Sequence, residues 1–352
     1  MGNARQARWG GKVTRNGGMQ DQSVIAVQDG RVGRIRLNRP KALNALDLAM
    51  IRAIAAALAE WRDDPAVHAV LIEGEGERAF CAGGDIRAIR QMRLDGHTDG
   101  IEAFFAEEYA LNLTIATYPK PYVALIDGIC MGGGIGVSVH GTARVASEHA
   151  LFAMPETGIG FFPDIGATYI LPRLPGFLGT YLALTGARME GADAVHAGLA
   201  THFVARADMA GLAADLVRDG AATLAVHAVP LPPFSLAPHR ALIDHTFGAS
   251  TVPEIMARLD ADGGDFARDT AKTLRAMSPS ALVWSLRLLR DGAERTLPAC
   301  LDAELRATRT VTAGHEFIEG VRAMVVDKDR KPDWQPARLE EVDRTKAEAM
   351  VA

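Results

Sequence analysis

The sequence predicts an α/β fold that is followed by a helical C-terminal region. Strand-like apolar runs, turns and helical stretches alternate from residue 24 to about residue 204, which is typical of strands joined by crossover helices. Beyond Pro230-Leu231-Pro232-Pro233 the strand signals stop, and only helical periodicity continues. Abundant alanine and an aromatic share of 6% also favour a helix-rich α/β protein.

The predicted core begins with a hairpin and a helix. Apolar or alternating runs at 24–27 and 32–37 flank Asp29-Gly30, a pair that is typical of tight hairpin turns. Asp47 is suited to cap a helix that continues to Trp61 with its apolar residues on one face. Strands are predicted next at 67–72, 122–126, 143–146 and 151–153, and helices after residue 85, at 101–117 and up to residue 140.

The ends of the chain complete the predicted organisation. Helices are expected near 252–259, 266–277, 280–289 and 297–310, and an ordered extended arm at 327–336. The first residues are basic and rich in glycine, as a transit peptide can be, but they lack serine and an apolar face. We therefore predict a disordered tail at 1–20, a catalytic core at 21–235, and a helical C-terminal region with an extended tail at 236–352.

Composition limits the partners and the compartment. A net charge of −5 and a pI near 6.1 argue against nucleic acid as the main partner. No apolar stretch in the sequence is long enough to span a membrane, so no membrane partner is expected. Three cysteines form neither a disulfide framework nor a metal-binding spacing, which predicts no metal and a reducing, cytoplasmic location.

Two glycine-rich turns are the most informative feature of the chain. Phe80–Asp85 and Met131–Gly136 each follow a strand-like run and open a predicted helix. If the fold brings them together, their bare backbone N–H groups make a pocket for one negatively charged oxygen. The dinucleotide fingerprint fails because its third glycine falls on Val137, and the lysine of a P-loop is absent. Close helix–strand packing is the alternative interpretation of one such turn.

Acidic residues near these turns are candidates for catalysis. Glu156 lies in an apolar, glycine-rich stretch, where desolvation would raise its pKa toward the range useful for a general base. Asp164 lies in the same stretch and is also suited to cap a short helix. Glu107 and Glu108 fall on a predicted helix, and the residues alone favour a solvated face for both.

Nucleophilic side chains near the turns do not form a recognisable pair. Ser138 and His140 are two apart on a presumed helix and point to different sides. Cys81 and Cys130 adjoin the glycine turns, but no histidine or asparagine arrangement activates them. We interpret both as buried structural thiols.

These motifs resemble the crotonase (enoyl-CoA hydratase/isomerase) superfamily. The resemblance rests on residues 38–46, 80–85, 131–136 and 154–156. A closer resemblance, to hydrolases of short 3-hydroxyacyl-CoA thioesters, rests on residues 107–109, 138–141, 152–157, 162–164, 200–204, 319–323, 327–329 and 332–334. It implies a crotonase-like spiral core of repeated ββα units, often assembled as trimers or hexamers. It also implies an acyl-CoA substrate and no cofactor beyond the CoA of that substrate.

The resemblance assigns roles to particular residues. The backbone N–H groups of Ala82 and Gly133 would hold the thioester oxygen. Glu156 would be the catalytic carboxylate, with Asp164 as a second catalytic candidate. Glu108 and Asp164 would line the acyl end near the substrate hydroxyl. The other substrate-binding positions implied are Lys41, Ala42, Gly84 and Asp85.

One departure from the hydratases favours hydrolysis. Hydratases that resemble this chain around Gly134 carry a second glutamate where Gly136 stands. Adding water across a double bond needs two such groups, whereas thioester hydrolysis needs one base or nucleophile and an oxyanion pocket. We therefore expect hydrolysis of a short branched 3-hydroxyacyl-CoA, as in valine breakdown. An enoyl-CoA hydratase or isomerase and a non-catalytic acyl-CoA-binding subunit remain the alternatives.

Overall fold

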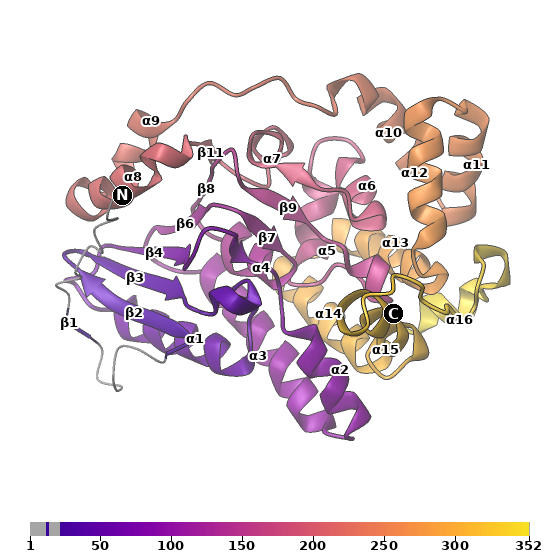
Figure 1. Ribbon diagram of the computed structural model, residues 1–352, viewed down its shortest axis with the longest axis horizontal. Coiled ribbons are helices and arrows are strands. Elements are labelled where there is room, and N and C mark those ends of the chain that lie inside the picture. The colour runs from indigo at the N-terminus through magenta and orange to yellow at the C-terminus, as the bar shows by residue number, and fades with distance from the viewer. Residues whose placement is uncertain (1–11, 14–21, 352) are drawn as a thin grey trace, which may run out of the picture.

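The computed structural model describes residues 12–13 and 22–351, which form a mixed α/β core and a helical C-terminal region (Figure 1). The disordered tail predicted at 1–20 lies outside the described residues except for Lys12–Val13. These two residues form strand β1, which pairs antiparallel with β2 (Val24–Asp29), so the prediction of disorder is wrong for them.

The larger sheet orders its strands β1-β2-β3-β4-β6-β8-β11 within the described residues. The hairpin predicted around Asp29-Gly30 is confirmed as an antiparallel pair of β2 and β3 (Val32–Leu37), and every later pairing in this sheet is parallel. The later strands are β4 (Ala69–Gly74), β6 (Tyr122–Ile126), β8 (Ala143–Ala146) and β11 (His202–Phe203). The last of these is a strand that the sequence did not predict.

A smaller sheet carries the glycine-rich turns. Its order is β10-β9-β7-β5, with β5 (Ala79–Cys81), β7 (Ile129–Met131) and β9 (Leu151–Ala153) parallel and β10 (Met189–Glu190) antiparallel. Because β5 and β7 are paired, with Cys81 opposite Cys130, their carboxyl ends meet at the same edge. The fold therefore brings the two glycine-rich turns side by side, as the predicted anion pocket requires.

Helices cover both faces of the larger sheet (Figure 1). On one face α1 (Leu48–Arg62) packs on β2 and β3, and a side chain at Gly33 would collide with the ring of Trp61. Asp47 caps α1 by accepting from Met50 N at 2.9 Å, as predicted. On the other face α8 (Arg206–Asp219) buries a separate cluster of apolar side chains. The other core helices are α2 (Ile86–Leu94), α3 (Thr98–Ala116), α4 (Gly133–Val139), α5 (Ala167–Ile170), α6 (Leu178–Thr185), α7 (Gly191–Ala197) and α9 (Leu224–His227).

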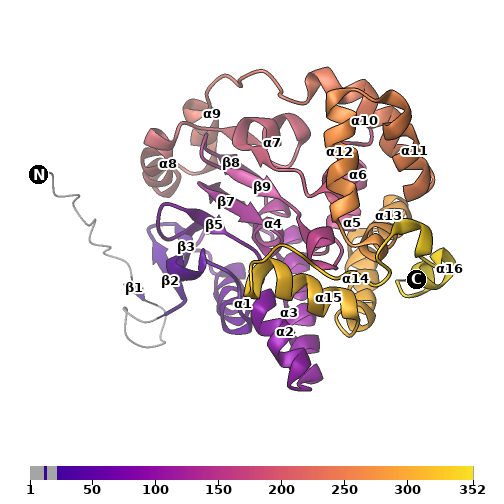
Figure 2. The same cartoon turned by 45° about the vertical axis from the view of Figure 1, so that its right-hand side comes forward.

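The C-terminal region folds back over the core of the same chain. Helices α14 (Leu297–Val311) and α15 (His315–Val321) lie beside α3 and α2 (Figure 2). A π-helical turn at Arg322–Val326 and an extended arm follow α15, and the arm matches the prediction for 327–336. The remaining helices are α10 (Arg240–Phe247), α11 (Val252–Asp262), α12 (Asp265–Ala276), α13 (Pro279–Ala293) and α16 (Arg344–Ala349). Among the described residues, none after Phe203 lies in a strand, and no helix is long and apolar enough to cross a membrane.

Candidate active site

The two glycine-rich turns approach each other closely where β5 and β7 end. Gly83 has a φ of +108° and Gly132 a φ of +46°, a backbone region that side chains disfavour. A side chain at Gly134 would collide with the carbonyl of Cys81, so the start of α4 packs directly on the first turn. The glycines thus allow the close helix–strand packing that was one interpretation of the sequence. The same packing brings the backbone N–H groups of the two turns together, as the other interpretation, an anion pocket, requires.

The backbone N–H groups at these turns correct one predicted donor. The N–H of Ala82 donates to the carbonyl of Leu43 at 3.0 Å, so that group is already used within the fold. The N–H groups of Gly84 and Gly133 have no acceptor among the described residues. The Gly84 nitrogen lies 3.2 Å from where a Cβ of Gly133 would stand. The free N–H groups where the two turns meet are therefore those of Gly84 and Gly133, and Ala82 is corrected because its N–H is not available to an anion.

Two buried glutamates flank this anion pocket. Glu156 begins a short 3-10 turn after Pro155, and its Oε1 lies 3.0 Å from where a Cβ of Gly132 would stand. A Cβ at Gly133 would collide with Oε1 of Glu108. One oxygen of each glutamate has no hydrogen-bond partner in the described chain. Burial, together with the nearby Asp164, raises the pKa of both carboxyls well above the usual range.

Helix α3 separates two neighbouring glutamates into different environments. Glu107 points outward and pairs with Arg52 at 2.6 Å. Glu108 is only 2% exposed and lines the pocket. The solvated position predicted from the residues alone is therefore correct for Glu107 and wrong for Glu108. The family resemblance had instead placed Glu108 at the acyl end of the site.

Asp164 is a third buried carboxyl in the pocket. Its Oδ2 accepts a hydrogen bond from the hydroxyl of Tyr109 at 2.6 Å. Burial raises the pKa of Asp164 to about 7, although the Tyr109 hydrogen bond opposes the shift. The helix-capping alternative is wrong, because α5 begins after Gly166 without a side-chain cap.

The pocket around these carboxyls has a volume of about 370 Å³ and largely apolar walls. Phe105 stacks on Phe161 at a centroid distance of 5.7 Å, and Phe161 contacts Phe317 of α15 at the same distance. Met324 and Val325 of the π-helical turn also line it. These residues of the C-terminal region were missed at the sequence level, because they lie between the last predicted helix and the predicted arm, and no local pattern shows which surface they cover.

Other predicted site residues lie outside this chemistry. Asp85 caps α2 by accepting from Ala88 N at 3.3 Å and pairs with Arg39 at 3.2 Å, and it does not line the pocket, so its substrate-binding role stays a prediction. Lys41 and Ala42 lie in an exposed 3-10 turn, Pro40–Ala42, and do not line the pocket, so their substrate-binding role stays a prediction.

The serine, histidine and cysteines are structural, as predicted. The Ser138 hydroxyl donates to the Gly134 carbonyl at 2.9 Å, and Nε2 of His140 bonds the carbonyl of Ile165 at 2.7 Å, so the two side chains do not pair. Burial raises the pKa of the Cys81 thiol to about 12 and also raises that of Cys130, which keeps both thiols protonated.

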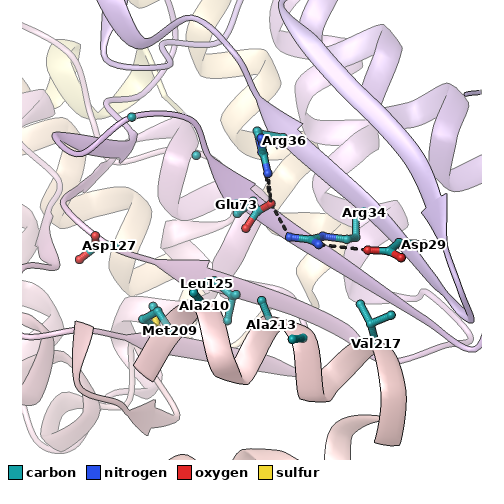
Figure 3. Close-up of a pocket in the computed structure, with 13 residues that line it drawn as sticks. Asp29, Arg34, Arg36, Glu73, Leu125, Asp127, Met209, Ala210, Ala213 and Val217 are labelled. Atoms are coloured by element: carbon teal, nitrogen blue, oxygen red, sulfur yellow. Dashed lines mark hydrogen bonds and ion pairs between the residues drawn. The ribbon is translucent and has the colours of Figure 1, made fainter. Parts of the chain in front are cut away.

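A larger cavity, of about 700 Å³, lies on the far face of the larger sheet between α8 and strands β3 and β4 (Figure 3). Its charged side chains are paired: Arg34 contacts Glu73 at 2.9 Å and Asp29 at 3.1 Å, and Asp127 contacts Arg206 at 3.0 Å. The buried carboxyls Glu108, Glu156 and Asp164 do not line it. The smaller pocket, with its backbone donors and partnerless carboxylate oxygens, is therefore the candidate active site.

An anion pocket of two backbone N–H groups beside buried carboxyls, on this α/β core, defines an acyl-CoA enzyme of the crotonase class. A family model described as enoyl-CoA hydratase/isomerase matches residues 32–351, and the chain belongs to this family. Proteins named 3-hydroxyisobutyryl-CoA hydrolase, mitochondrial, are similar over most of the chain. The Xenopus laevis protein is 48% identical, and the match covers 92% of this chain and 87% of the relative. The Homo sapiens protein is 46% identical, and the match covers 91% of this chain and 86% of the relative.

Solved structures share the whole fold. A carnitinyl-CoA dehydratase from Mycobacterium thermoresistibile has a TM-score of 0.90 and 42% identity, covering 94% of this chain and 97% of its own. An enoyl-CoA hydratase from Rhodobacter sphaeroides has a TM-score of 0.89 and 41% identity with the same coverage. The predicted fold and superfamily are thereby confirmed. The relatives' names place those proteins in mitochondria, so they lend no support to the cytoplasmic location predicted for this chain.

Proposed function

We propose that this protein hydrolyses 3-hydroxyisobutyryl-CoA to the free acid and CoA, as a step in valine breakdown. The observation that carries the proposal is the position of Glu156 beside the free N–H groups of Gly84 and Gly133, with no second acid at Gly136. The similarity to hydrolases of that name supports the choice of substrate.

The reaction begins with the thioester oxygen accepting hydrogen bonds from Gly84 and Gly133. These donors stabilise the negative charge that develops on the oxygen when the carbonyl carbon is attacked. Glu156 acts in its ionised form by one of two routes. As a base, it takes a proton from water, hydroxide adds to the carbonyl, the C–S bond breaks, and the proton passes to the CoA sulfur.

As a nucleophile, Glu156 would instead attack the carbonyl carbon directly. The C–S bond then breaks to release CoA, and a mixed anhydride remains until water cleaves it. Both routes consume one water and need no cofactor apart from the CoA in the substrate. The raised pKa of Glu156 makes it a stronger base or nucleophile once it is ionised.

Glu108 and Asp164 are the proposed partners of the 3-hydroxyl group. Their pKa values are raised by burial, and their negative charges would repel each other, so the pair favours holding a proton. A carboxyl pair that shares a proton can both donate to and accept from a hydroxyl. This polar end, opposite apolar walls, suits a short branched acyl group that carries one hydroxyl.

Hydration of an enoyl-CoA is the second candidate, because the solved structure titled enoyl-CoA hydratase is 41% identical to this chain. Space at Gly136 argues against it. A Cβ there would stand 2.9 Å from Cβ of Ile165 and 3.0 Å from Nδ2 of Asn112, so a second glutamate has no room without displacing both. Hydrolysis requires no group at that position.

Release of free CoA, followed with a thiol-reactive dye, tests the proposal. We expect thiol release from 3-hydroxyisobutyryl-CoA, slower release from 3-hydroxypropionyl-CoA, and none from crotonyl-CoA. Glu156→Gln should lower turnover by roughly 100- to 10,000-fold, while Glu107→Gln on the exposed side of α3 should leave it unchanged. Hydration of crotonyl-CoA without thiol release would support the second candidate. CoA binding with no thiol release from any acyl-CoA would support a non-catalytic subunit.

Two further questions belong to the same proposal. Single turnover in heavy-oxygen water separates the two routes, because label retained in Glu156 indicates the anhydride. The trimer or hexamer predicted from the resemblance stays a prediction.

A further inference from the structure

A fourth buried carboxyl, Glu304 of α14, lies behind the catalytic pocket rather than in it. Its side chain is 0% exposed. Oε2 accepts from the N–H of Gly166 at 2.7 Å, and Oε1 accepts from the N–H of Thr168 at 3.0 Å and from its hydroxyl at 2.5 Å. Glu304 therefore binds the backbone immediately after Asp164, although 140 residues separate the two in the sequence.

The segment that Glu304 holds is an unusual turn. Ile165 has a φ of +59° and Gly166 a φ of +81°. A β-branched residue rarely adopts a positive φ, and such a conformation persists only where surrounding contacts enforce it. The Asp164 side chain leaves the backbone just before this turn, so the direction of its carboxyl depends on the turn being kept.

Contacts from separate elements fix this turn on each side. Tyr109 of α3 binds the Asp164 carboxyl, and Nε2 of His140 bonds the Ile165 carbonyl. Burial lowers the pKa of His140 to about 4, so the ring is neutral near pH 7 and must donate through Nε2 to that carbonyl. Of these groups, Glu304 alone comes from the C-terminal region, and it accepts from the N–H of Gly166 in the turn and from that of Thr168 just after it.

We propose that Glu304 is a positioning residue that holds the Ile165–Gly166 turn and so directs the Asp164 carboxyl at the 3-hydroxyl group of the substrate. This inference rests on the proposed function for the identity of the substrate. A buried carboxyl is costly unless it is hydrogen-bonded. Here Oε2 is bonded to Gly166 in the turn, and Oε1 is bonded to Thr168 just after it. Burial raises the pKa of Glu304 to about 8, the hydrogen bonds from Thr168 and Gly166 lower it, and the nearby Asp164 raises it further.

Three variants separate positioning from simple stabilisation. Glu304→Gln keeps the size but replaces one acceptor oxygen with an NH2 group, which cannot accept from a backbone N–H. Thr168→Val removes the hydroxyl that donates to Glu304. Thr308→Val is the matched control, because its buried hydroxyl lies one turn further along α14 and bonds only within that helix.

Kinetics with two substrates provide the first measurement. For 3-hydroxyisobutyryl-CoA we expect Glu304→Gln to lower kcat/KM by roughly 10- to 100-fold. For isobutyryl-CoA, which lacks the hydroxyl, we expect a change of about twofold or less, since Asp164 has no hydroxyl to bind there. Thr168→Val should act in the same direction, and the double variant should lose less than the sum of the single losses. Thr308→Val should leave the ratio between substrates unchanged.

Amide hydrogen exchange provides a second measurement that does not depend on activity. Glu304→Gln should speed exchange at Gly166 and Thr168, while exchange in β4 stays as in the wild type. The proposal is overturned if exchange at these amides is unaltered, or if both substrates lose activity equally. If the wild type releases no thiol from any acyl-CoA, the proposed function fails. Amide exchange at Gly166 and Thr168 in Glu304→Gln still tests the positioning role: faster exchange supports it, and unchanged exchange overturns it.

Discussion

Substitution of Gly136 by alanine tests how tightly α4 packs against Ile165 and Asn112. In the interior of a helix, Gly→Ala usually stabilises by about 0.4–1 kcal/mol. At Gly136 the new methyl group would lie 2.9 Å from Cβ of Ile165 and 3.0 Å from Nδ2 of Asn112, well inside ordinary contact distance. Overpacking of this kind costs about 1–3 kcal/mol.

Gly211 of α8 offers a matched control. It is an exposed helical glycine, and a methyl group there would meet only the edge of the His227 ring, at 3.8 Å. Gly211→Ala should therefore show the gain in helix stability without the collision. The difference in unfolding free energy between the two variants isolates the collision, and we expect Gly136→Ala to be less stable by about 1–3 kcal/mol.

Urea unfolding measures this difference from the two midpoints, provided that the slopes agree. Thiol release should fall for Gly136→Ala as well, because the displaced Ile165 adjoins Asp164. Equal stabilisation of both variants, with full activity at Gly136→Ala, would refute the packing argument and with it the reason given for the missing second glutamate.

Three other perturbations have expected outcomes. Glu108→Gln should reduce kcat/KM for the 3-hydroxy substrate by on the order of tenfold and leave that for isobutyryl-CoA nearly unchanged, which steady-state kinetics would check. Asp164 has a pKa raised from 3.8 to about 7 in the folded state, so the stability that it contributes is present below about pH 4 and is lost as the pH rises toward 7. Asp164→Asn should therefore gain stability relative to the wild type across that interval, as urea unfolding at pH 4 and pH 8 would show; a constant difference would contradict the raised pKa. Phe317→Ala should destabilise by about 3–5 kcal/mol and admit longer acyl chains, measured as thiol release from a series of acyl-CoA substrates.

Local signals predicted much of the core. The Asp29-Gly30 hairpin, the Asp47 cap and the buried strand at 122–126 are confirmed, because each depends on neighbouring residues in the chain. The glycine-rich turns also lie together as expected, since parallel strands place their carboxyl ends at one edge. Ala82 was chosen wrongly as a donor because its bond to Leu43 joins segments far apart in the sequence.

The polar interior of the site was harder to predict for the same reason. Whether Glu107 or Glu108 is buried depends on which face of α3 is covered by α4 and α14, and helical spacing does not reveal that. Glu304 had no local signature at all, because its partners at Gly166 and Thr168 lie in another part of the chain. Only the folded arrangement shows that these acids share one interior.

The contact between Phe161 and Phe317 has a consequence for how the protein is made. Translation adds roughly 5–20 residues per second, and the N-terminal part of a chain begins to fold first. The carboxyls of the candidate site emerge from the ribosome well before α15, whose Phe317 lines the pocket and contacts Phe161. A nascent chain thus holds its acidic site open to water until the C-terminal region arrives, so hydrolase activity should appear only as synthesis finishes.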